Sequence, residues 1–222
     1  FDTSTIISLV TNNLLWILKL LNQKFKGDFY ITEEVKKELI DVPLKSRKFK
    51  FEAITIMQTI KEGNLKLSEE DINVKTDELL FLANNIFNAK NEWINIVHKA
   101  EMEALAFASF IKADAFVVDE RTIRLLVENP TRLAKLLQSK LHTKVTVNLK
   151  NLRAFQHEVG RVNIIRSVDL MVIAYESGLL NKFIFENGSR KNLLDGVLWG
   201  VKLRGCSVSE NEINEIMKIE GF

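Results

Sequence analysis

The sequence has little of what marks secreted or membrane-spanning proteins. Its single cysteine, Cys206, excludes an intrachain disulfide and a cysteine-rich zinc site. No apolar run reaches the about 18 to 20 residues that cross a bilayer, and no signal peptide is visible. We therefore expect a cytoplasmic protein that makes no membrane contact. Because Phe1-Asp2 is typical of the end of a strand, we also expect a few residues to precede Phe1.

Proline, glycine and net charge are also low. Two prolines and nine glycines in 222 residues favour helices joined by short loops. The formal net charge of +2 excludes a general basic coat, so any contact with nucleic acid must come from local basic patches. There is no glycine-rich phosphate loop, which leaves nucleoside triphosphate hydrolysis unsupported.

Short apolar runs alternate with longer amphipathic stretches along the first two thirds of the chain. The continuous run 115–118 is typical of a parallel strand buried on both faces. Further strands are predicted at 29–31, near 65 and at 145–147. Helices are predicted at about 5–10, 14–25, 32–40 (beginning at Thr32 and ended by Pro43), 49–60, 79–87, 99–111, 131–141, 164–176, 191–203 and from Ser209, which begins a Ser-x-x-Glu capping box.

This alternation predicts an α/β fold with a central, mainly parallel sheet and helices on both faces. We assign it to residues 1–150. No strand is predicted after about residue 160, so residues 151–222 are expected to form a C-terminal helical extension packed on the first domain.

Acidic residues stand where strands end. Asp2 follows Phe1, and Asp119 follows the strand 115–118. In open α/β sheets, binding sites form outside the carboxyl ends of the strands. Glu38 and Glu101 are candidates from their positions on helices. Each acid also has a structural interpretation: Asp2 as a helix N-cap, Glu101 as a partner of the helix dipole and Glu38 as a solvated surface acid.

Carboxylates that converge need a counter-charge. Mg²⁺ or Mn²⁺ supplies it, since these ions prefer carboxylate and water oxygens and leave positions open for phosphate oxygens. Such an ion activates water and neutralises the charge that grows on a phosphate in the transition state. The acids therefore favour metal-dependent hydrolysis of a phosphate ester.

Four segments, in this order, resemble the acidic blocks of PIN-domain nucleases, a family that includes VapC-like toxins and larger prokaryotic proteins. They are Phe1-Asp2-Thr3-Ser4, then residues 31–39, then residues 100–106, then Val117-Val118-Asp119-Glu120-Arg121. The resemblance covers roughly residues 1–150. It implies a PIN-like three-layer fold, with Asp2, Glu38, Glu101 and Asp119 as catalytic, metal-binding acids, Glu120 as an auxiliary metal-binding acid, and a Ser4 hydroxyl beside Asp2.

The sequence departs from this family pattern in two blocks. Many relatives have Gly-Glu where this chain has Ala100-Glu101, and Asp-Asp where it has Asp119-Glu120. Glu103 is a rival of Glu101. The span between Glu38 and Glu101 is longer than in the compact toxins.

Basic residues near these blocks are candidate contacts for nucleic acid. Arg121 and Arg124 follow Asp119 and are expected to flank the proposed site, and guanidinium groups pair bidentately with phosphates. Lys48 belongs to a basic run with Lys45, Arg47 and Lys50. Ordinary surface charge is the alternative for both groups. The three histidines show no metal-ligand spacing, and the three tryptophans are expected in the core.

The favoured function is a Mg²⁺- or Mn²⁺-dependent endoribonuclease whose substrate is RNA. One alternative keeps the fold as a nucleic-acid-binding or assembly module with an incomplete site. Another is a phosphohydrolase with Asp2 as the nucleophile, although Ser4 stands where such enzymes usually have a second acid. The toxin interpretation adds an antitoxin or other protein partner, and the C-terminal helices offer a surface for a homodimer.

Overall fold

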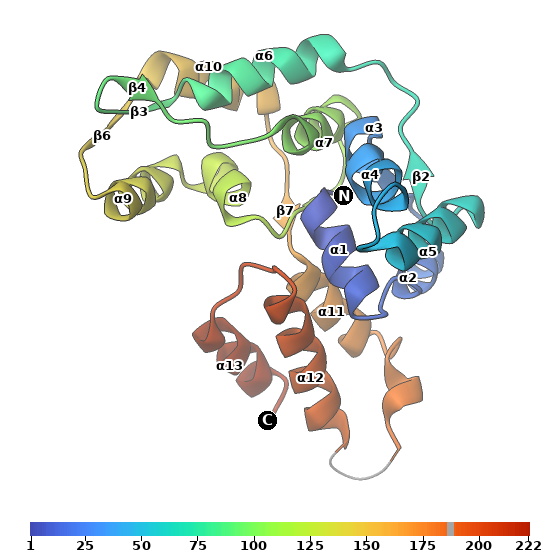
Figure 1. Ribbon diagram of the computed structural model, residues 1–222. Coiled ribbons are helices and arrows are strands. Elements are labelled where there is room, and N and C mark those ends of the chain that lie inside the picture. The colour runs from blue at the N-terminus through green and yellow to red at the C-terminus, as the bar shows by residue number, and fades with distance from the viewer. Residues whose placement is uncertain (186–188) are drawn as a thin grey trace.

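The computed structural model describes the backbone of residues 1–185 and 189–222, and it is a mixed α/β structure in which helices predominate (Figure 1). The first half contains α1 (Thr3–Thr11), α2 (Ile17–Phe25), β1 (Tyr30–Ile31), α3 (Glu33–Lys36), the π-helical turn η1 (Lys37–Asp41), α4 (Val42–Leu44), α5 (Lys50–Lys61), β2 (Lys66–Leu67), α6 (Asn73–Asn84), β3 (Phe87–Ala89), β4 (Glu92–Trp93) and α7 (Lys99–Phe110). The second half contains β5 (Phe116–Val117), α8 (Arg121–Glu128), α9 (Pro130–Leu141), β6 (Val145–Val147), α10 (Leu149–Val159), β7 (Ile164–Ile165), α11 (Ser167–Glu176), the 3₁₀ turn η2 (Asn181–Phe183), α12 (Ser189–Leu203) and α13 (Glu210–Ile219).

The strands pair in three small sheets. Two are parallel pairs, β1 with β2 and β5 with β7. The third has the order β4-β3-β6 and is antiparallel. The strand predicted at 145–147 therefore exists as β6, but it belongs to the antiparallel sheet and not to a parallel one.

Residues 1–2 lie between the two parallel pairs. The backbone nitrogen of Phe1 donates to the carbonyl of Tyr30 in β1 at 2.7 Å. The next nitrogen, that of Asp2, donates to the carbonyl of Val117 in β5 at 3.0 Å. Successive N–H groups of an extended chain point to opposite sides, so two consecutive residues link β1 and β5. Asp2 and Asp119 consequently emerge beside each other.

The most buried side chains come from elements on both sides of this linkage. Fully buried examples are Ile6, Leu9, Ile31, Leu105, Phe116, Phe155 and Met171. The segment 99–111, predicted as a helix apolar almost all round, forms α7, whose residues Met102 to Ala108 are all buried. Such a helix needs neighbours on several sides, and α3, α6, α10 and β5 supply them.

Two sequence predictions of elements are wrong, and some elements are missing from the prediction. The helix predicted at 79–87 lies earlier, as α6, because Ile86 and Phe87 leave it to enter β3. Two helices, α8 and α10, were not predicted at all. Strands do not stop at residue 160, since Ile164–Ile165 forms β7 beside β5 and the following helix begins only at Ser167.

The helix predicted at 32–40 is present but is built differently. Thr32 occupies the N-cap position without a side-chain hydrogen bond. Pro43 does not end the helical path, which continues to Leu44. The wide turn η1 opens the helix just before Pro43, whose missing N–H would interrupt the regular hydrogen-bond pattern. Glu38 lies within this turn.

The last three helices, α11 to α13, gather at one end of the molecule, and α6 with α10 lies at the other (Figure 1). Ser209 and Glu212 form the predicted capping box at the start of α13. Since α10 packs on α6 and β7 pairs with β5, residues after 150 also take part in the packing of the first part. The division of the chain at residue 150 stays a prediction. Among the described residues, no helix is both long and apolar enough to cross a bilayer.

Candidate acidic site

Asp2 lies directly before α1 and is almost completely buried. Its side chain caps α1, with Oδ2 accepting hydrogen bonds from Ser4 N at 3.2 Å and from Ser4 Oγ at 2.6 Å. The residue is 1% exposed. Its other oxygen, Oδ1, is buried and has no hydrogen-bond partner among the described residues. Most buried polar atoms have a partner, so this unpaired oxygen is an exception that a bound ligand would explain.

Ser4 joins Asp2 to Asp119. While its hydroxyl donates to Asp2, the same oxygen accepts a hydrogen bond from the backbone nitrogen of Asp119 at 3.3 Å. Asp119 follows β5 and is fully buried. One hydroxyl therefore spans two residues that are far apart in sequence, and the structure brings the first and last acidic blocks together.

Both oxygens of Asp119 are held from the start of α11. Ser167 donates its backbone N–H to Oδ1 at 2.7 Å and its hydroxyl to Oδ2 at 2.6 Å. The thiol of Cys206 is a further donor. Burial raises the pKa of Asp119 above its usual range, these hydrogen bonds oppose the shift, and the charge of Asp2 adds to it. Burial and the neighbouring Asp119 raise the pKa of Cys206 to about 12, so the thiol stays protonated.

Glu101 faces the same group of acids from α7. Its Oε2 accepts a hydrogen bond from His98 N at 2.8 Å, which closes the first turn of the helix. Burial is the largest cause that raises its pKa to about 7; the charges of Asp2, Glu120 and Glu38 contribute to the shift, and the His98 hydrogen bond opposes it. These four carboxylates therefore lie within electrostatic range of one another.

Glu38 and Glu120 complete the group, which we call the acid cluster (Asp2, Glu38, Glu101, Asp119 and Glu120). Glu38 is exposed, and its Oε2 accepts a hydrogen bond from Thr3 Oγ1 at 2.7 Å. Glu120 is the N-cap of α8 and accepts hydrogen bonds from the backbone nitrogens of Thr122 and Ile123. Within the described residues, none of the five acids forms an ion pair.

Glu103, the alternative to Glu101 as the acid of this segment, has a structural role outside the acid cluster. It is 6% exposed, and its Oε2 accepts a hydrogen bond from the backbone nitrogen of Glu34 at 2.8 Å. That nitrogen lies in the first turn of α3, where the Thr32 side chain makes no cap. Glu103 therefore caps a neighbouring helix, and Glu101 is the acid of this segment that belongs to the cluster.

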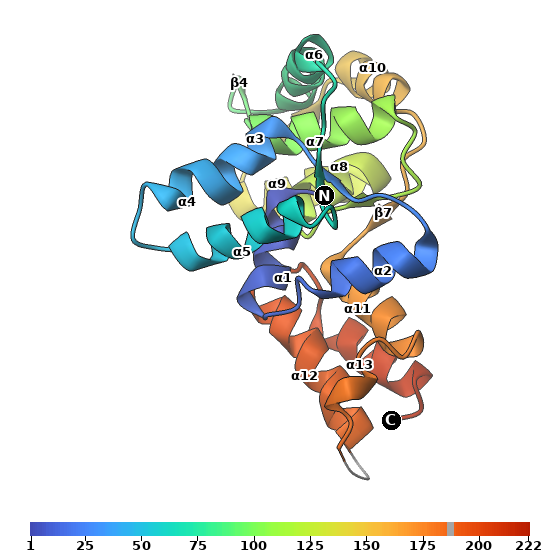
Figure 2. The same cartoon turned by 90° about the vertical axis from the view of Figure 1, so that its right-hand side faces the viewer.

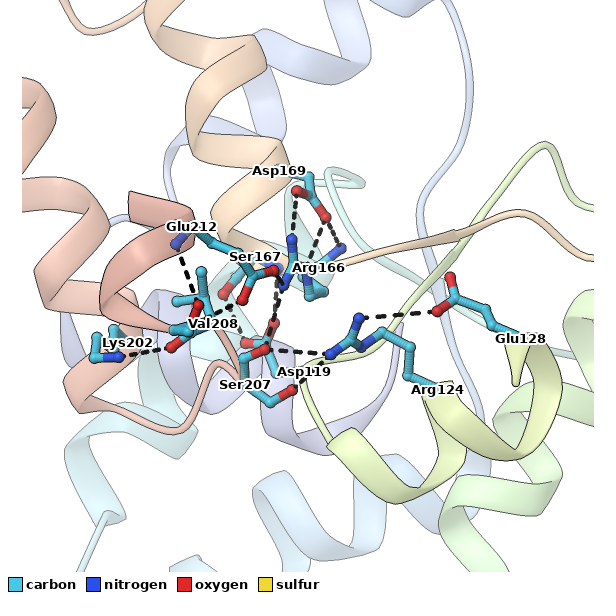
Figure 3. A network of polar contacts seen from close by, with 11 residues as sticks. Asp119, Arg124, Glu128, Arg166, Ser167, Asp169, Lys202, Ser207, Val208 and Glu212 are labelled. Carbon is cyan, nitrogen blue, oxygen red and sulfur yellow. Dashed lines mark hydrogen bonds and ion pairs between the residues drawn. The ribbon is translucent and has the colours of Figure 1, made fainter. Parts of the chain in front are cut away.

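The predicted nucleic-acid contacts lie in three different settings. Arg124 is turned toward Ser207, reaching its Oγ at 3.3 Å, and lies 3.8 Å from Glu128. This places it between α8 and the loop before α13 rather than open to solvent (Figure 3). Arg121 and Lys48 are both exposed. Lys48 stands on the loop between α4 and α5.

Sequence reasoning missed the residues that hold Asp119 from the C-terminal part. Ser167 binds its side chain, and Ser207 N donates to its carbonyl at 3.2 Å. Arg166 donates to Ser207 O at 3.3 Å and pairs with Asp169 and Glu212 (Figure 3). A signal exists: the short apolar run Ile164-Ile165 stands two residues before Ser167, but the sequence pattern alone predicts it as the start of a helix.

The histidines and tryptophans are mostly peripheral. His98, His142 and His157 are exposed at the surface. Trp93 is 47% exposed, so its predicted place in the core is wrong. Trp16 and Trp199 are partly buried.

The fit of the cluster to a divalent cation rests on its donor set. Carboxylate oxygens are the ligands that Mg²⁺ and Mn²⁺ prefer, and Asp2 Oδ1 is buried without a partner. On the other hand, within residues 1–185 and 189–222 no three His, Cys, Asp or Glu side chains are arranged so that they could hold one ion together.

No protein-family model, no curated protein and no solved structure was found to match this chain.

Proposed function

We propose that this chain is a divalent-metal-dependent endoribonuclease of the PIN-domain kind. The observation that carries the proposal is the open oxygen of Asp2, buried at the carboxyl ends of parallel strands and surrounded by carboxylates without an ion pair among the described residues. A cluster of partly buried carboxylates raises the free energy of the folded state unless a counter-charge is present. The finer fold belongs to the same proposal: residues 1–2 link two parallel pairs, which supports a three-layer arrangement around one sheet.

The acids would divide the work by position. Asp2, with its open Oδ1, would hold a Mg²⁺ or Mn²⁺ ion together with Glu101, Glu38 and Glu120. Asp119 would reach the ion through lone pairs that its Ser167 hydrogen bonds leave free, since a carboxylate has about four acceptor sites. When bound, such an ion lowers the pKa of water and stabilises charge on a phosphate.

The other residues would position the substrate. Ser4 fixes Oδ2 of Asp2 and thereby the direction of Oδ1. Arg121, exposed beside the cluster, is placed to contact an RNA phosphate, and Lys48 is exposed on a nearby loop. Arg124 would act through Ser207 and hold the loop before α13.

The test is cleavage of a labelled RNA with Mn²⁺ and with chelator. Cleavage is expected with the ion, and it should be abolished by chelator and reduced by at least about a hundredfold in Asp2→Asn and in Asp119→Asn. Asp114→Asn is the matched control, since Asp114 is an exposed acid before β5. Full cleavage by both cluster variants would refute the proposal.

A second candidate is a PIN-type module that binds nucleic acid without cutting it. The favouring observation is that both oxygens of Asp119 are already engaged by Ser167. RNA binding with no cleavage under Mg²⁺, Mn²⁺ or other divalent ions would select this candidate.

A further inference from the structure

The loop between α4 and α5, together with the first two residues of α5, carries a basic and aromatic sequence. Residues 45–51 read Lys-Ser-Arg-Lys-Phe-Lys-Phe, and all seven are exposed. We call this segment the arm tip, because α4 and α5 extend from the body of the molecule and the loop closes their outer end (Figure 2). Ser46 shapes it by donating to the carbonyl of Lys48 at 2.7 Å.

The four cations of the arm tip have no acidic partner. Lys45, Arg47, Lys48 and Lys50 form no ion pair within the described residues. By contrast, the lysines of α3 and η1 pair with acids on their own helix. Four unpaired cations among six residues produce a local positive potential that attracts a polyanion.

Two phenylalanine rings stand among these charges. Phe51 is 76% exposed and Phe49 is 41% exposed. Lys48 Nζ lies 4.7 Å from the centre of the Phe49 ring. Apolar rings in water are unfavourable, whereas unpaired nucleobases stack on them and every base has a face for this contact.

The arm tip lies beside the acid cluster. Phe49 and Glu38 line the same surface hollow, together with Leu39, Pro43 and Ile56. Glu38 is in turn bound to Thr3, next to Asp2. The hollow therefore brings the arm tip next to Glu38, a member of the acid cluster.

We propose that the arm tip is a docking surface for single-stranded nucleic acid. The bases of the nucleic acid stack on Phe49 and Phe51, and its phosphates lie against the four cations of the arm tip. The proposal builds on the proposed function by giving the substrate a path, but docking itself requires neither a metal ion nor the carboxylates. A symmetric contact between two copies of the chain is disfavoured, because it would bring two sets of four like charges together.

The experiment measures binding of a fluorescein-labelled single-stranded oligoribonucleotide by anisotropy, with the full chain in EDTA. Phe51→Ala is expected to weaken binding about tenfold, and Phe51→Tyr should keep nearly full affinity because it keeps the ring. Lys48→Ala should lower the slope of log affinity against log salt by about one. Affinity for a duplex of the same sequence should be insensitive to Phe51→Ala.

Matched controls come from surfaces away from the arm tip. Phe81, 64% exposed on α6, provides the control for loss of an exposed ring, Phe81→Ala. Lys135, exposed on α9, provides the control for loss of a surface charge, Lys135→Ala. The proposal is overturned if Phe51→Ala loses no more affinity than Phe81→Ala, or if Lys48→Ala and Lys135→Ala have the same salt slope. It is also overturned if sedimentation shows a dimer that Phe51→Ala dissociates, or if anionic vesicles bind through Phe51 and RNA does not.

These experiments distinguish failure of the docking proposal from failure of the nuclease proposal. Binding in EDTA that depends on Phe51, together with no cleavage under Mn²⁺, would support the docking surface and refute the nuclease. Cleavage that depends on Asp2, with binding insensitive to Phe51 and Lys48, would do the reverse.

Discussion

Asp2 combines a structural and a proposed chemical role in one carboxylate. Oδ2 caps α1 through Ser4, which is the structural interpretation of an aspartate before Thr-Ser. Oδ1 is left buried without a partner among the described residues. The two interpretations that the sequence left open are therefore compatible, because Oδ2 makes the cap and Oδ1 remains unpaired for the proposed metal ion. Glu101 is similar, since it closes the first turn of α7 and also faces the acid cluster.

The protonation of Glu101 should be visible in the pH dependence of stability. Its pKa is about 7 in the folded protein and 4.5 in an unfolded chain. A raised carboxyl pKa means that its contribution is fully present below about pH 4.5 and is lost as pH rises through about 7. In EDTA we expect the free energy of unfolding to fall by up to about 3 kcal/mol over this window from this group.

Glu101→Gln should remove the fall in the free energy of unfolding that comes from ionisation of Glu101, so the variant should be more stable than the wild type at pH 8. Denaturant unfolding of both proteins at a series of pH values measures the difference, and other titrating groups cancel in it. Parallel curves for the two proteins from pH 5 to pH 8 would show that Glu101 titrates as in water.

At the scale of elements, the site depends on the start of α11. Ser167 presents its backbone N–H and its hydroxyl to Asp119, both within 2.7 Å. Arg166, one residue earlier, pairs with Asp169 on α11 and with Glu212 on α13. Two consecutive residues thus connect the acid cluster to the last helices.

Removing the Ser167 hydroxyl should destabilise the fold. Ser167→Ala leaves a buried oxygen of Asp119 with one donor fewer, at an expected cost of about 1 to 3 kcal/mol. Urea unfolding measures it. Ser177→Ala, at the other end of α11, is the control, and equal stability of the two variants would contradict the assigned role.

Breaking the Arg166 pairs should release α13. Arg166→Ala removes the contacts to Glu212 and to the Ser207 carbonyl. We expect faster amide exchange over residues 210–219 by mass spectrometry, with little change in α7. Arg161→Ala, at an exposed position before β7, is the control. Unchanged exchange in α13 would mean that its apolar residues alone hold it.

The elements that the sequence predicted well are those with local signals. The capping box of Ser209, the amphipathic pattern of α5 and the apolar run of β5 depend on neighbours in the chain. The start of α11 and the cap of α3 depend instead on distant segments. The strand β7, which pairs with β5, precedes α11 and limits where it begins, and Glu103 caps α3 from another helix. Contacts between distant segments leave no periodic trace in a single sequence.

The acid cluster also combines features that the sequence predicted with contacts between distant segments that it did not predict. The placement of Asp2 and Asp119 after strands predicted that they would meet, and Ser4 was expected beside Asp2. The partners of Asp119 were not foreseen, because Ser167 and Cys206 lie far along the chain. Arg124 was assigned to phosphate from its position alone, whereas its direction depends on where the loop at Ser207 folds back.

For the whole molecule, the central question is whether the cluster binds a cation. Burial and like charges raise the pKa of Glu101 and of Asp119, so the folded chain without an ion carries unfavourable electrostatic energy at neutral pH. A bound divalent cation would relieve it and would stabilise the folded state over the unfolded one.

The most direct test is a crystal soaked in Mn²⁺, with the anomalous signal located in the difference map. The account predicts a peak in coordination distance of Asp2 Oδ1, about 2.0 to 2.4 Å away, that is lost in Asp2→Asn crystals. Full diffraction with no peak at the acid cluster, or a peak only at other surface carboxylates, would contradict it.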